Sequence, residues 1–416
     1  MKINYTLNKL FKKRNLKSKF FYPLNSENLR NRDIVEGIKI MLTKNVTMSK
    51  KTLEFESYFK KKIKVRNALM LNSGSSANFL AVQCLINPYR KKKLKFGDEI
   101  LVPSICWSTT LWPIVQSGLK PVFVDVDKNT FNISLKDLKS KITKRSKAIM
   151  LVHVLGNSTN MDDLMKIKRQ HNLILIEDTC ESLGSKYKGK YLGTFGEFST
   201  FSFYISHQIS SIEGGMICCN SNEDSEIIKS LRSHGYARGL KNQKKIEKKN
   251  KNIDIKFLFI NSGYNFRPTD LQAAIGLSQL KSLDKFTLNR SINRTLIINA
   301  LENDKRWKNH VTFLEANEEV QASWFGIAML LNKKFLADKK YIIRKINKLG
   351  IETRPIISGN FAKQPSVKKY KLIRKSEKFP NADYVDRLGF FIGLSTNKMA
   401  ITNIKKFKDI FFNAFK

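Results

Sequence analysis

Short apolar segments alternate with helical segments between about residues 67 and 220. The strand-like segments read NALMLNSG, DEILVP, PVFVDVD, KAIMLVHVLG and LILIED. Between them lie SSANFLAVQCLI, which is apolar on all sides like a buried helix, and MDDLMKIKRQHN, which has an amphipathic helical period. This alternation is typical of a mainly parallel sheet covered by helices. FSTFSFYI and GGMICCN predict two further strands.

The pattern changes after the segment GYNFRPTDLQAAIGLSQLKSLDKF. A long helix around residues 281–301 leads into a part with its own strands, ASWFGIAMLL and GIETRPII, and further helices. We therefore predict a large α/β domain of residues 40–290. A smaller α+β domain is expected to combine residues 1–39 with residues 291–416.

Length and composition place the chain among globular proteins. Its 416 residues are enough for two hydrophobic cores, and 42% hydrophobic residues argue against general disorder. No apolar run reaches the length of a membrane span. The first 23 residues are basic and lack a continuous apolar core, so they do not form a secretory signal. We expect them to form a basic amphipathic helix packed on the domain, rather than an organelle transit segment, in a cytoplasmic protein without a membrane partner.

The chain carries a large positive charge. Its 76 Lys and Arg residues exceed its 35 Asp and Glu residues by 41. Most lysines are scattered, and only GLKNQKKIEKKNKNIDIK is densely basic. We interpret this run as a solvated loop in preference to a nucleic-acid-binding arm, so no nucleic-acid partner is expected. A positive enzyme would still attract an anionic nucleotide diphosphate.

Five cysteines and five histidines show no metal-binding spacing. No CxxC motif is present, which fits a reducing compartment. Cys218 and Cys219 are neighbours in a predicted strand, where their side chains point to opposite faces. A metal site shared by the two thiols is therefore not expected.

The segment NSGSSAN lies between a predicted strand and a predicted helix. Gly74 permits a tight backbone there, and Ser75 and Ser76 place hydroxyl and N–H groups at the helix N-terminus. The unpaired N–H groups and the helix dipole both favour an anion, so the segment is a candidate phosphate site. The alternative is an ordinary serine cap of the helix.

Asp178 ends a buried strand in LILIED, and Glu181 follows three residues later. Ligands of open α/β sheets bind at the carboxyl ends of the strands. The Asp178 carboxylate could pair there with a protonated ring nitrogen, or it could cap the next helix. Trp107 follows another strand end and could stack on a flat aromatic ring, or it could belong to the core.

The segment FSFYISHQISSIEGG contains Ser202 and His207. No lysine occurs between Lys190 and Lys229, although the chain is rich in lysine. This gap indicates a segment from which amines are excluded. The alternative is a buried strand and loop with a core histidine.

Together, NSGSSAN, VPSICWSTT, VFVDVD, IEDTCESLGSKYKGKYLGTFGEFSTFSFY and GYNFRPTDLQAAIGLSQL resemble the DegT/DnrJ/EryC1/StrS family of sugar aminotransferases. The resemblance extends from about residue 35 to the end. It implies the aspartate-aminotransferase fold, which is fold type I of pyridoxal-phosphate (PLP) enzymes. It also implies that Ser75, Ser76 and Ser202 hold the cofactor phosphate. Asn265 would reach the phosphate of the neighbouring subunit, which implies a homodimer with shared active sites.

The resemblance also assigns residues to the cofactor ring. It implies that Asp178 binds the pyridine nitrogen, that Trp107 stacks on the ring and that Glu181 hydrogen-bonds the ring hydroxyl. Arg238 and Arg267, because of their charge and their position near the motifs, are candidates for binding the glutamate carboxylate or the nucleotide phosphates.

His207 stands where ordinary family members have the lysine that holds the cofactor as an imine. Imidazole forms no such imine, so the cofactor would bind non-covalently or as pyridoxamine phosphate (PMP). SHQISSIEGG and ETRPIISGNF are similar to a family subset, the 3-dehydratases of nucleotide-linked 4-keto-6-deoxy sugars. The resemblance implies a lyase that removes the C3 oxygen of the sugar. His207 would be the base, since imidazole titrates near neutral pH.

This subset has two versions. One uses L-glutamate to regenerate the amine cofactor and acts on the GDP-mannose series, and the other needs an iron–sulfur cluster and acts on the CDP-glucose series. No cysteine follows Cys219, whereas a cluster needs about four thiolates placed together. We therefore favour GDP-4-keto-6-deoxy-D-mannose as substrate, in deoxysugar synthesis for surface polysaccharide. The iron–sulfur enzyme, a true aminotransferase whose lysine comes from elsewhere, and a non-catalytic nucleic-acid binder stay open as alternatives.

Overall fold

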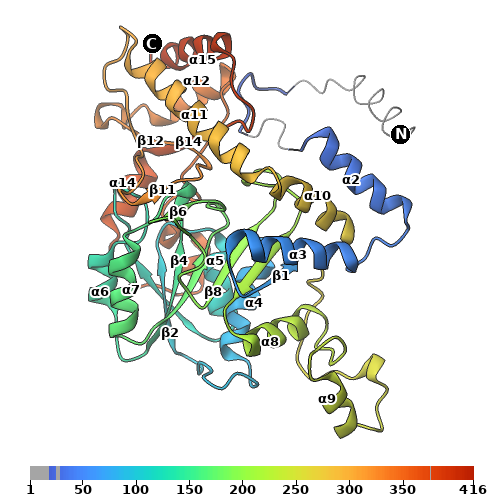
Figure 1. Ribbon diagram of the computed structural model, residues 1–416. Coiled ribbons are helices and arrows are strands. Elements are labelled where there is room, and N and C mark those ends of the chain that lie inside the picture. Colours follow the sequence, from blue (N-terminus) through green and yellow to red (C-terminus); the bar gives the residue numbers. More distant parts are fainter. Residues whose placement is uncertain (1–17, 25–28, 375) are drawn as a thin grey trace.

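A computed structural model describes residues 18–24, 29–374 and 376–416 (Figure 1). The amphipathic helix predicted for the first 23 residues falls mostly outside these residues. No helix in the described part of the chain is both long enough and apolar enough to cross a bilayer.

A seven-stranded sheet forms the centre of the molecule. Its order is β1-β9-β8-β5-β4-β2-β3, and only β9 runs antiparallel to its neighbours. The strands are β1 (Asn67–Leu71), β2 (Glu99–Pro103), β3 (Lys120–Val124), β4 (Ser146–Val152), β5 (Ile174–Asp178), β8 (Phe198–Ser202) and β9 (Gly215–Cys219). The prediction of a mainly parallel sheet is confirmed.

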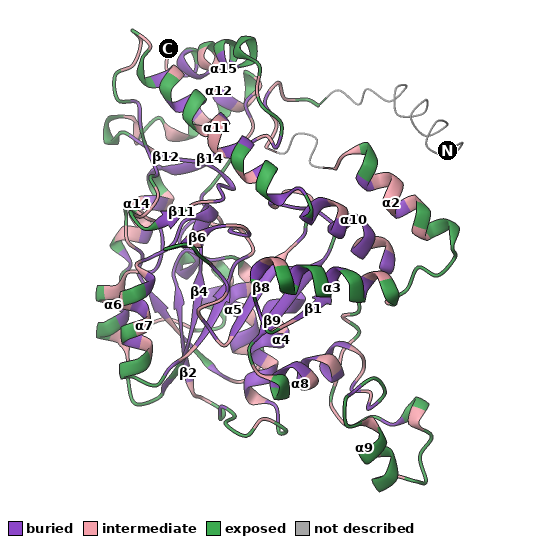
Figure 2. Cartoon of the chain, viewed as in Figure 1, coloured by how far each residue is buried: buried purple, intermediate pink, exposed green. Residues whose placement is uncertain are grey.

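Helices cover both faces of this sheet, and Figure 2 shows its strands buried between them. One face packs against α4 (Gly74–Ile86), α5 (Ser108–Gln116) and α8 (Asn222–Arg232). The other packs against α3 (Lys50–Ile63), α6 (Leu135–Lys141), α7 (Met161–Gln170) and α10 (Asp270–Leu280). Cys218 packs in the core on the α3 side and Cys219 in the core on the α4 side, so their predicted opposite orientation is confirmed.

The long helix α11 (Leu283–Glu302) leads from the large sheet to a second, antiparallel sheet. This sheet has the order β10-β12-β14-β13. Its strands are β10 (Val311–Phe313), β12 (Gly326–Leu331), β13 (Thr353–Arg354) and β14 (Gly389–Gly393). The accompanying helices are α12 (Lys339–Lys348), α13 (Pro365–Lys369), α14 (Pro380–Leu388) and α15 (Ile401–Asn413). Strands and helices thus combine here as predicted for an α+β part.

Shorter elements complete the described chain. A small antiparallel sheet contains β6 (Lys186–Tyr187), β7 (Lys190–Tyr191) and β11 (Val320–Gln321). Single 3-10 turns occur at Val154–Gly156, Ile255–Phe257, Lys333–Phe335 and Phe361–Lys363. The basic run interpreted as a solvated loop contains the short helix α9 (Gln243–Lys249), which has no buried residue and projects from the body of the molecule (Figures 1 and 2).

The N-terminal part of the described chain contacts the second, antiparallel sheet through Tyr22 and the helices of the large sheet through α2. Tyr22 bridges to Ile351, and its hydroxyl donates to the carbonyl of Gly393 at 2.9 Å. Helix α2 (Asn31–Leu42) instead lies along α10. The predicted boundary between residues 39 and 40 therefore falls inside α2, and the division into two domains stays a prediction.

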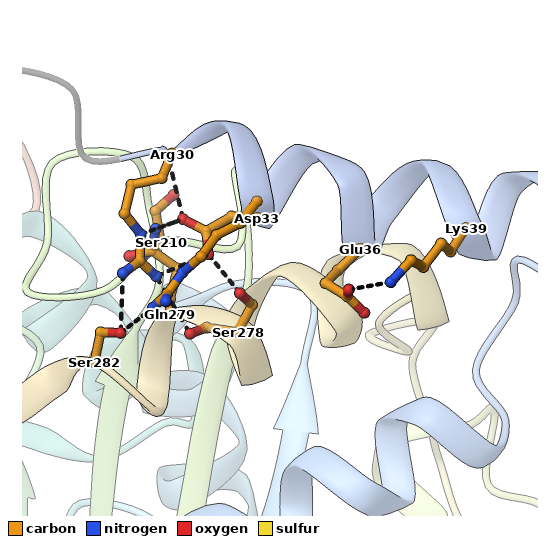
Figure 3. Close-up of polar contacts among 9 residues, drawn as sticks. Arg30, Asp33, Glu36, Lys39, Ser210, Ser278, Gln279 and Ser282 are labelled. Carbon is orange, nitrogen blue, oxygen red and sulfur yellow. Dashed lines mark hydrogen bonds and ion pairs between the residues drawn. The ribbon is translucent and has the colours of Figure 1, made fainter. Parts of the chain in front are cut away.

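A buried carboxylate joins α2 to α10 (Figure 3). Asp33 is fully buried and accepts hydrogen bonds from Arg30 on its own helix and from Ser278 and Gln279 on α10. The Gln279 side-chain oxygen in turn accepts the backbone N–H of Ser210 at 3.4 Å. Ser210 is three residues after His207, so this contact reaches the segment that carries the candidate base.

Candidate active site

The turn between β1 and α4 exposes a helix N-terminus. Ser73 caps α4 by accepting the N–H of Ser76, whose hydroxyl donates to Asn72 at 2.6 Å. Ser75 is exposed, and its hydroxyl donates to Thr109 on α5 at 3.1 Å. The alternative of a serine cap is thus realised by Ser73, and it leaves Ser75 facing outward at the positive end of the helix dipole.

Three backbone segments meet at this turn. A Cβ atom added to Gly74 would lie 2.6 Å from the Cβ of Ser202 at the end of β8. One added to Gly215, at the start of β9, would lie 2.3 Å from the carbonyl of Ser73. The two glycines are needed because any side chain would force these segments apart. Their close approach brings Ser202 beside the α4 N-terminus. We call Ser75, Ser202 and this helix N-terminus the cradle, and their role in binding phosphate stays a prediction.

Asp178 lies buried at the carboxyl end of β5, next to this cradle. One carboxylate oxygen accepts from the Asn78 amide and the Thr110 hydroxyl, both at 2.8 Å. The other accepts the backbone N–H of Cys180 at 3.2 Å. Asn78 also accepts from the Thr200 hydroxyl. The carboxylate is therefore held in one orientation, with an oxygen able to take a further donor.

Asn78 and Thr110 were not predicted as site residues. Both lie inside the motifs NSGSSAN and VPSICWSTT. A polar amide within an otherwise apolar helix was the signal that could have indicated Asn78, because buried polar groups need partners.

Trp107 immediately precedes α5 and is 57% exposed. The alternative of a core tryptophan is therefore wrong. Thr109 and Thr110, two and three residues later, contact Ser75 and Asp178. The indole thus follows β2 on the same sheet edge as the cradle and the carboxylate.

Glu181 lies in the turn after β5, and its carboxylate accepts the backbone N–H of Leu155 at 3.0 Å. Burial raises the pKa of Glu181 to about 7, the nearby Asp178 charge adds to this rise, and the Leu155 N–H opposes it. Near neutral pH the carboxyl group is therefore part protonated, so it can donate as well as accept a hydrogen bond.

His207 lies in the segment between β8 and β9. Its ring is 5.4 Å from the ring of Phe325 and 6.4 Å from that of Tyr204, between centroids. Burial and, after it, the positive charge of Arg290 lower the pKa of His207 to about 3. The imidazole is therefore neutral at physiological pH, and it titrates well below the near-neutral range expected from its ordinary pKa.

Hydrogen bonds from two side chains hold the His207 segment against its surroundings. The Gln208 amide donates to the carbonyls of Glu181 and Ser323, and Arg290 donates to the carbonyl of His207 at 3.3 Å. Sequence reasoning missed Gln208, Phe325 and Arg290. Phe325 and Arg290 are more than 80 residues from His207 in the chain, so no local pattern connects them to the site.

The predicted phosphate- or carboxylate-binding residues are exposed. Arg267 donates to the side chain of Asn265 at 3.1 Å, and the Arg238 guanidinium lies 4.9 Å from the ring centre of Tyr236. The segment of Asn265 adjoins the cradle, since the carbonyl of Phe266 accepts the N–H of Asn72. The roles of the three side chains stay predictions.

Comparison with known proteins identifies the family. Residues 28–397 match the model of the DegT/DnrJ/EryC1/StrS aminotransferase family. The chain belongs to this family. Members of known structure share its fold, so the predicted aspartate-aminotransferase fold of PLP enzymes is confirmed.

Within the family, the chain is similar to the following relative and two solved structures. The chain is 37% identical over 375 residues to a GDP-4-keto-6-deoxy-D-mannose 3-dehydratase of Escherichia coli, covering 89% of this chain and 95% of that protein. A solved GDP-4-keto-6-deoxymannose-3-dehydratase variant with bound GDP-perosamine is 34% identical, with a TM-score of 0.86 and coverage of 94% and 100%. The same enzyme with a trapped PLP–glutamate geminal diamine is 34% identical, with a TM-score of 0.84 and coverage of 95% and 100%.

Proposed function

We propose that this chain is a PLP- or PMP-dependent lyase that removes the C3 oxygen of GDP-4-keto-6-deoxy-D-mannose, with L-glutamate as the amino donor. The observation that carries this proposal is a neutral histidine, His207, where ordinary family members place a lysine. The similar 3-dehydratases, one of them with bound GDP-perosamine and one with a PLP–glutamate adduct, support the choice of substrate and donor.

The residues present fit PLP. The exposed Ser75 and the α4 N-terminus, with Ser202 beside them, offer hydroxyl and N–H donors to a phosphate. Asp178 offers a buried anion to a protonated pyridine nitrogen, and Trp107 offers an exposed indole face to a flat ring. A phosphate, a cationic ring and an aromatic face are the groups that these side chains recognise, and PLP has all three.

When bound, the cofactor supplies the electron sink for bond cleavage in the sugar. Asp178 would keep a proton on the ring nitrogen, because Asn78 and Thr110 fix the orientation of its carboxylate. Glu181, with its raised pKa, would hydrogen-bond the ring hydroxyl. His207 accepts a proton at an imidazole nitrogen and, unlike a lysine, has no amine that could enter covalent chemistry.

The product decides between this reaction and transamination. The purified protein would be given GDP-4-keto-6-deoxymannose, PLP and glutamate, and the products would be analysed by mass spectrometry with a parallel assay for free ammonia. We expect a keto-sugar lighter by one oxygen, together with ammonia. An amino-sugar without ammonia would mean an aminotransferase and would overturn the proposal. His207→Gln serves as the control that should form neither product.

The proposed enzyme acts as a homodimer in the cytoplasm. The exposed Asn265, Arg238 and Arg267 support an active site completed by a second copy, since each is free to contact another chain. The high positive charge supports capture of an anionic nucleotide sugar. Deoxygenation of this sugar would serve the synthesis of a dideoxyhexose for surface polysaccharide.

A further inference from the structure

Arg290 on α11 is the largest fully buried side chain of the described residues, with 2% of its surface exposed. Its Nη2 donates to the carbonyl of His207 at 3.3 Å. Its Nε and Nη1 have no hydrogen-bond partner among the described residues, and no carboxylate contributes to its electrostatic surroundings there. Among the described residues, no carboxylate therefore forms an ion pair with this buried guanidinium.

Burying such a charge lowers the stability of the folded protein. Removing a cation from water costs several kcal/mol unless a partner compensates. Burial lowers the pKa of Arg290 to about 10, while Tyr22 favours the charged form, so the side chain stays cationic at neutral pH. Arg290 has this desolvation cost and is hydrogen-bonded to the backbone of the candidate base, which indicates that it acts in the site.

The described groups near His207 contribute little charge that could oppose that of Arg290. The segment itself contributes the exposed phenol of Tyr204, and the chain before β12 contributes the uncharged ring of Phe325. The turn after β5 contributes Glu181, whose carboxylate is directed to the N–H of Leu155 and whose raised pKa keeps it partly neutral. Tyr22, which interacts electrostatically with Arg290, donates its hydroxyl to the carbonyl of Gly393.

We propose that Arg290 is a positioning residue for His207. Its hydrogen bond holds the backbone of the segment that carries His207, and its positive charge keeps the imidazole unprotonated at neutral pH. Protonating the imidazole would place two cations side by side in a buried region, which is unfavourable. The inference rests on the proposed role of His207 as the base.

The test is an NMR titration of histidine side chains in the cofactor-free protein. The chain has five histidines, and His207→Gln identifies the signal of His207 by its loss. We expect His207 of the parent to titrate far below the ordinary histidine pKa of about 6.5. Arg290→Gln, which keeps a donor but removes the charge, should move this titration upward by about one pH unit or more. Arg290→Lys, which keeps the charge, should leave it low.

A matched control lies one turn further along α11. Arg294 pairs with Glu315 and lies 4.4 Å from the ring centre of Trp324, so its charge is compensated. Arg294→Gln should leave the His207 titration unchanged. If Arg290→Gln folds and His207 titrates as in the parent, the proposal is wrong. If that variant does not fold, the parent still decides, because titration of its His207 at or above about 6.5 also overturns the proposal.

Activity separates this inference from the proposed function. In the product assay, Arg290→Gln should move the acidic limb of the pH–rate profile upward, whereas a purely structural defect would lower the rate equally at every pH. A titration that shifts in a protein without dehydratase activity would refute the proposed function alone. Normal dehydration without the shift would refute the role of Arg290 alone.

Discussion

At the scale of single residues, burial gives two titratable groups of the site their useful forms. It raises the pKa of Glu181 to about 7 and lowers that of His207 to about 3. In each case the uncharged form is favoured because a charge is poorly solvated there. A partly protonated carboxyl group and a neutral imidazole therefore coexist near neutral pH.

The charge of Asp178 is expected to be essential. Asp178→Asn keeps the shape of the side chain but removes the anion that retains a proton on the ring nitrogen. We expect turnover to fall on the order of 100-fold or more, measured by product formation with saturating PLP and glutamate. Asp409→Asn, at an exposed ion pair with Arg306, is the control and should behave like the parent. Unchanged turnover in the Asp178 variant would refute the assigned role.

The lowered pKa of His207 predicts a pH-dependent stability. The unfolded chain binds a proton at this site below about pH 6.5, whereas the folded protein resists it down to about pH 3. The parent should therefore lose stability as the pH falls through this window. His207→Gln removes the effect, so its free energy of unfolding relative to the parent should rise by about 2 kcal/mol between pH 6.5 and 5. Denaturant unfolding of both proteins at both pH values measures this difference. An equal change in the free energy of unfolding of the two proteins between pH 6.5 and 5 would contradict the prediction.

At the scale of elements, the site depends on how neighbouring helices hold the segment between β8 and β9. Arg290 contacts it from α11, and Gln279 contacts it from α10. Gln279 in turn donates to Asp33 on α2 (Figure 3). An N-terminal helix distant in sequence thus supports the segment of the candidate base through one intermediate side chain.

The Asp33 contact should stabilise this arrangement. Burial acts to raise its pKa, but hydrogen bonds from Arg30 and Ser278 outweigh burial and hold the pKa below its ordinary value. The stabilisation is therefore present at neutral pH and is lost as the pH falls. We expect Asp33→Asn to lower the free energy of unfolding by about 2 kcal/mol at neutral pH and by less in acid.

A control for this measurement lies on the same helix. Glu36 pairs with Lys39 at an exposed site, with 38% of its own side chain accessible (Figure 3). Glu36→Gln should change the stability by less than about 0.5 kcal/mol. An Asp33 variant as stable as the Glu36 variant would show that the buried carboxylate adds nothing.

At the scale of the whole molecule, the sheet order assembles the site. Strands β5, β4 and β2 run parallel, so the turns that follow them open at one edge. β9 runs against β8 and returns the chain to the start of α4, where Gly215 touches Ser73. The cradle, the carboxylate and the histidine segment meet for this reason.

The proposed homodimer predicts complementation between two defective chains. His207→Gln removes the base, and Asn265→Ala removes a group proposed to act on the neighbouring subunit. When the two variants are co-expressed in equal amounts, random pairing should make about half of the dimers heterodimers, each with one intact site. About a quarter of the parent activity should therefore return. Isolation of the heterodimer through two affinity tags checks the result. An inactive heterodimer would place Asn265 and His207 in the same chain's site.

Local patterns predicted much of the fold and part of the site. Strand-like runs ending in NSGSSAN and LILIED indicated a parallel sheet with an anion site and a carboxylate at its edge. This was possible because helix N-termini favour anions and parallel strands bind ligands at their carboxyl ends. The helical Asn78 and the distant Arg290 were not predicted. Their importance depends on contacts with Asp178 and His207, which are 100 and 83 residues away, respectively.

By itself, the sequence determined the alternation of strands and helices, the residue types at the strand ends and the absence of a lysine from 191 to 228. These are properties of neighbouring residues, which local propensity and spacing express directly. Only the tertiary structure decided that Trp107 is exposed, that Glu181 and His207 are desolvated, and that an unpaired arginine lies against the histidine. Burial and electrostatic fields are sums over residues from the entire chain, so they exist only once the chain has folded.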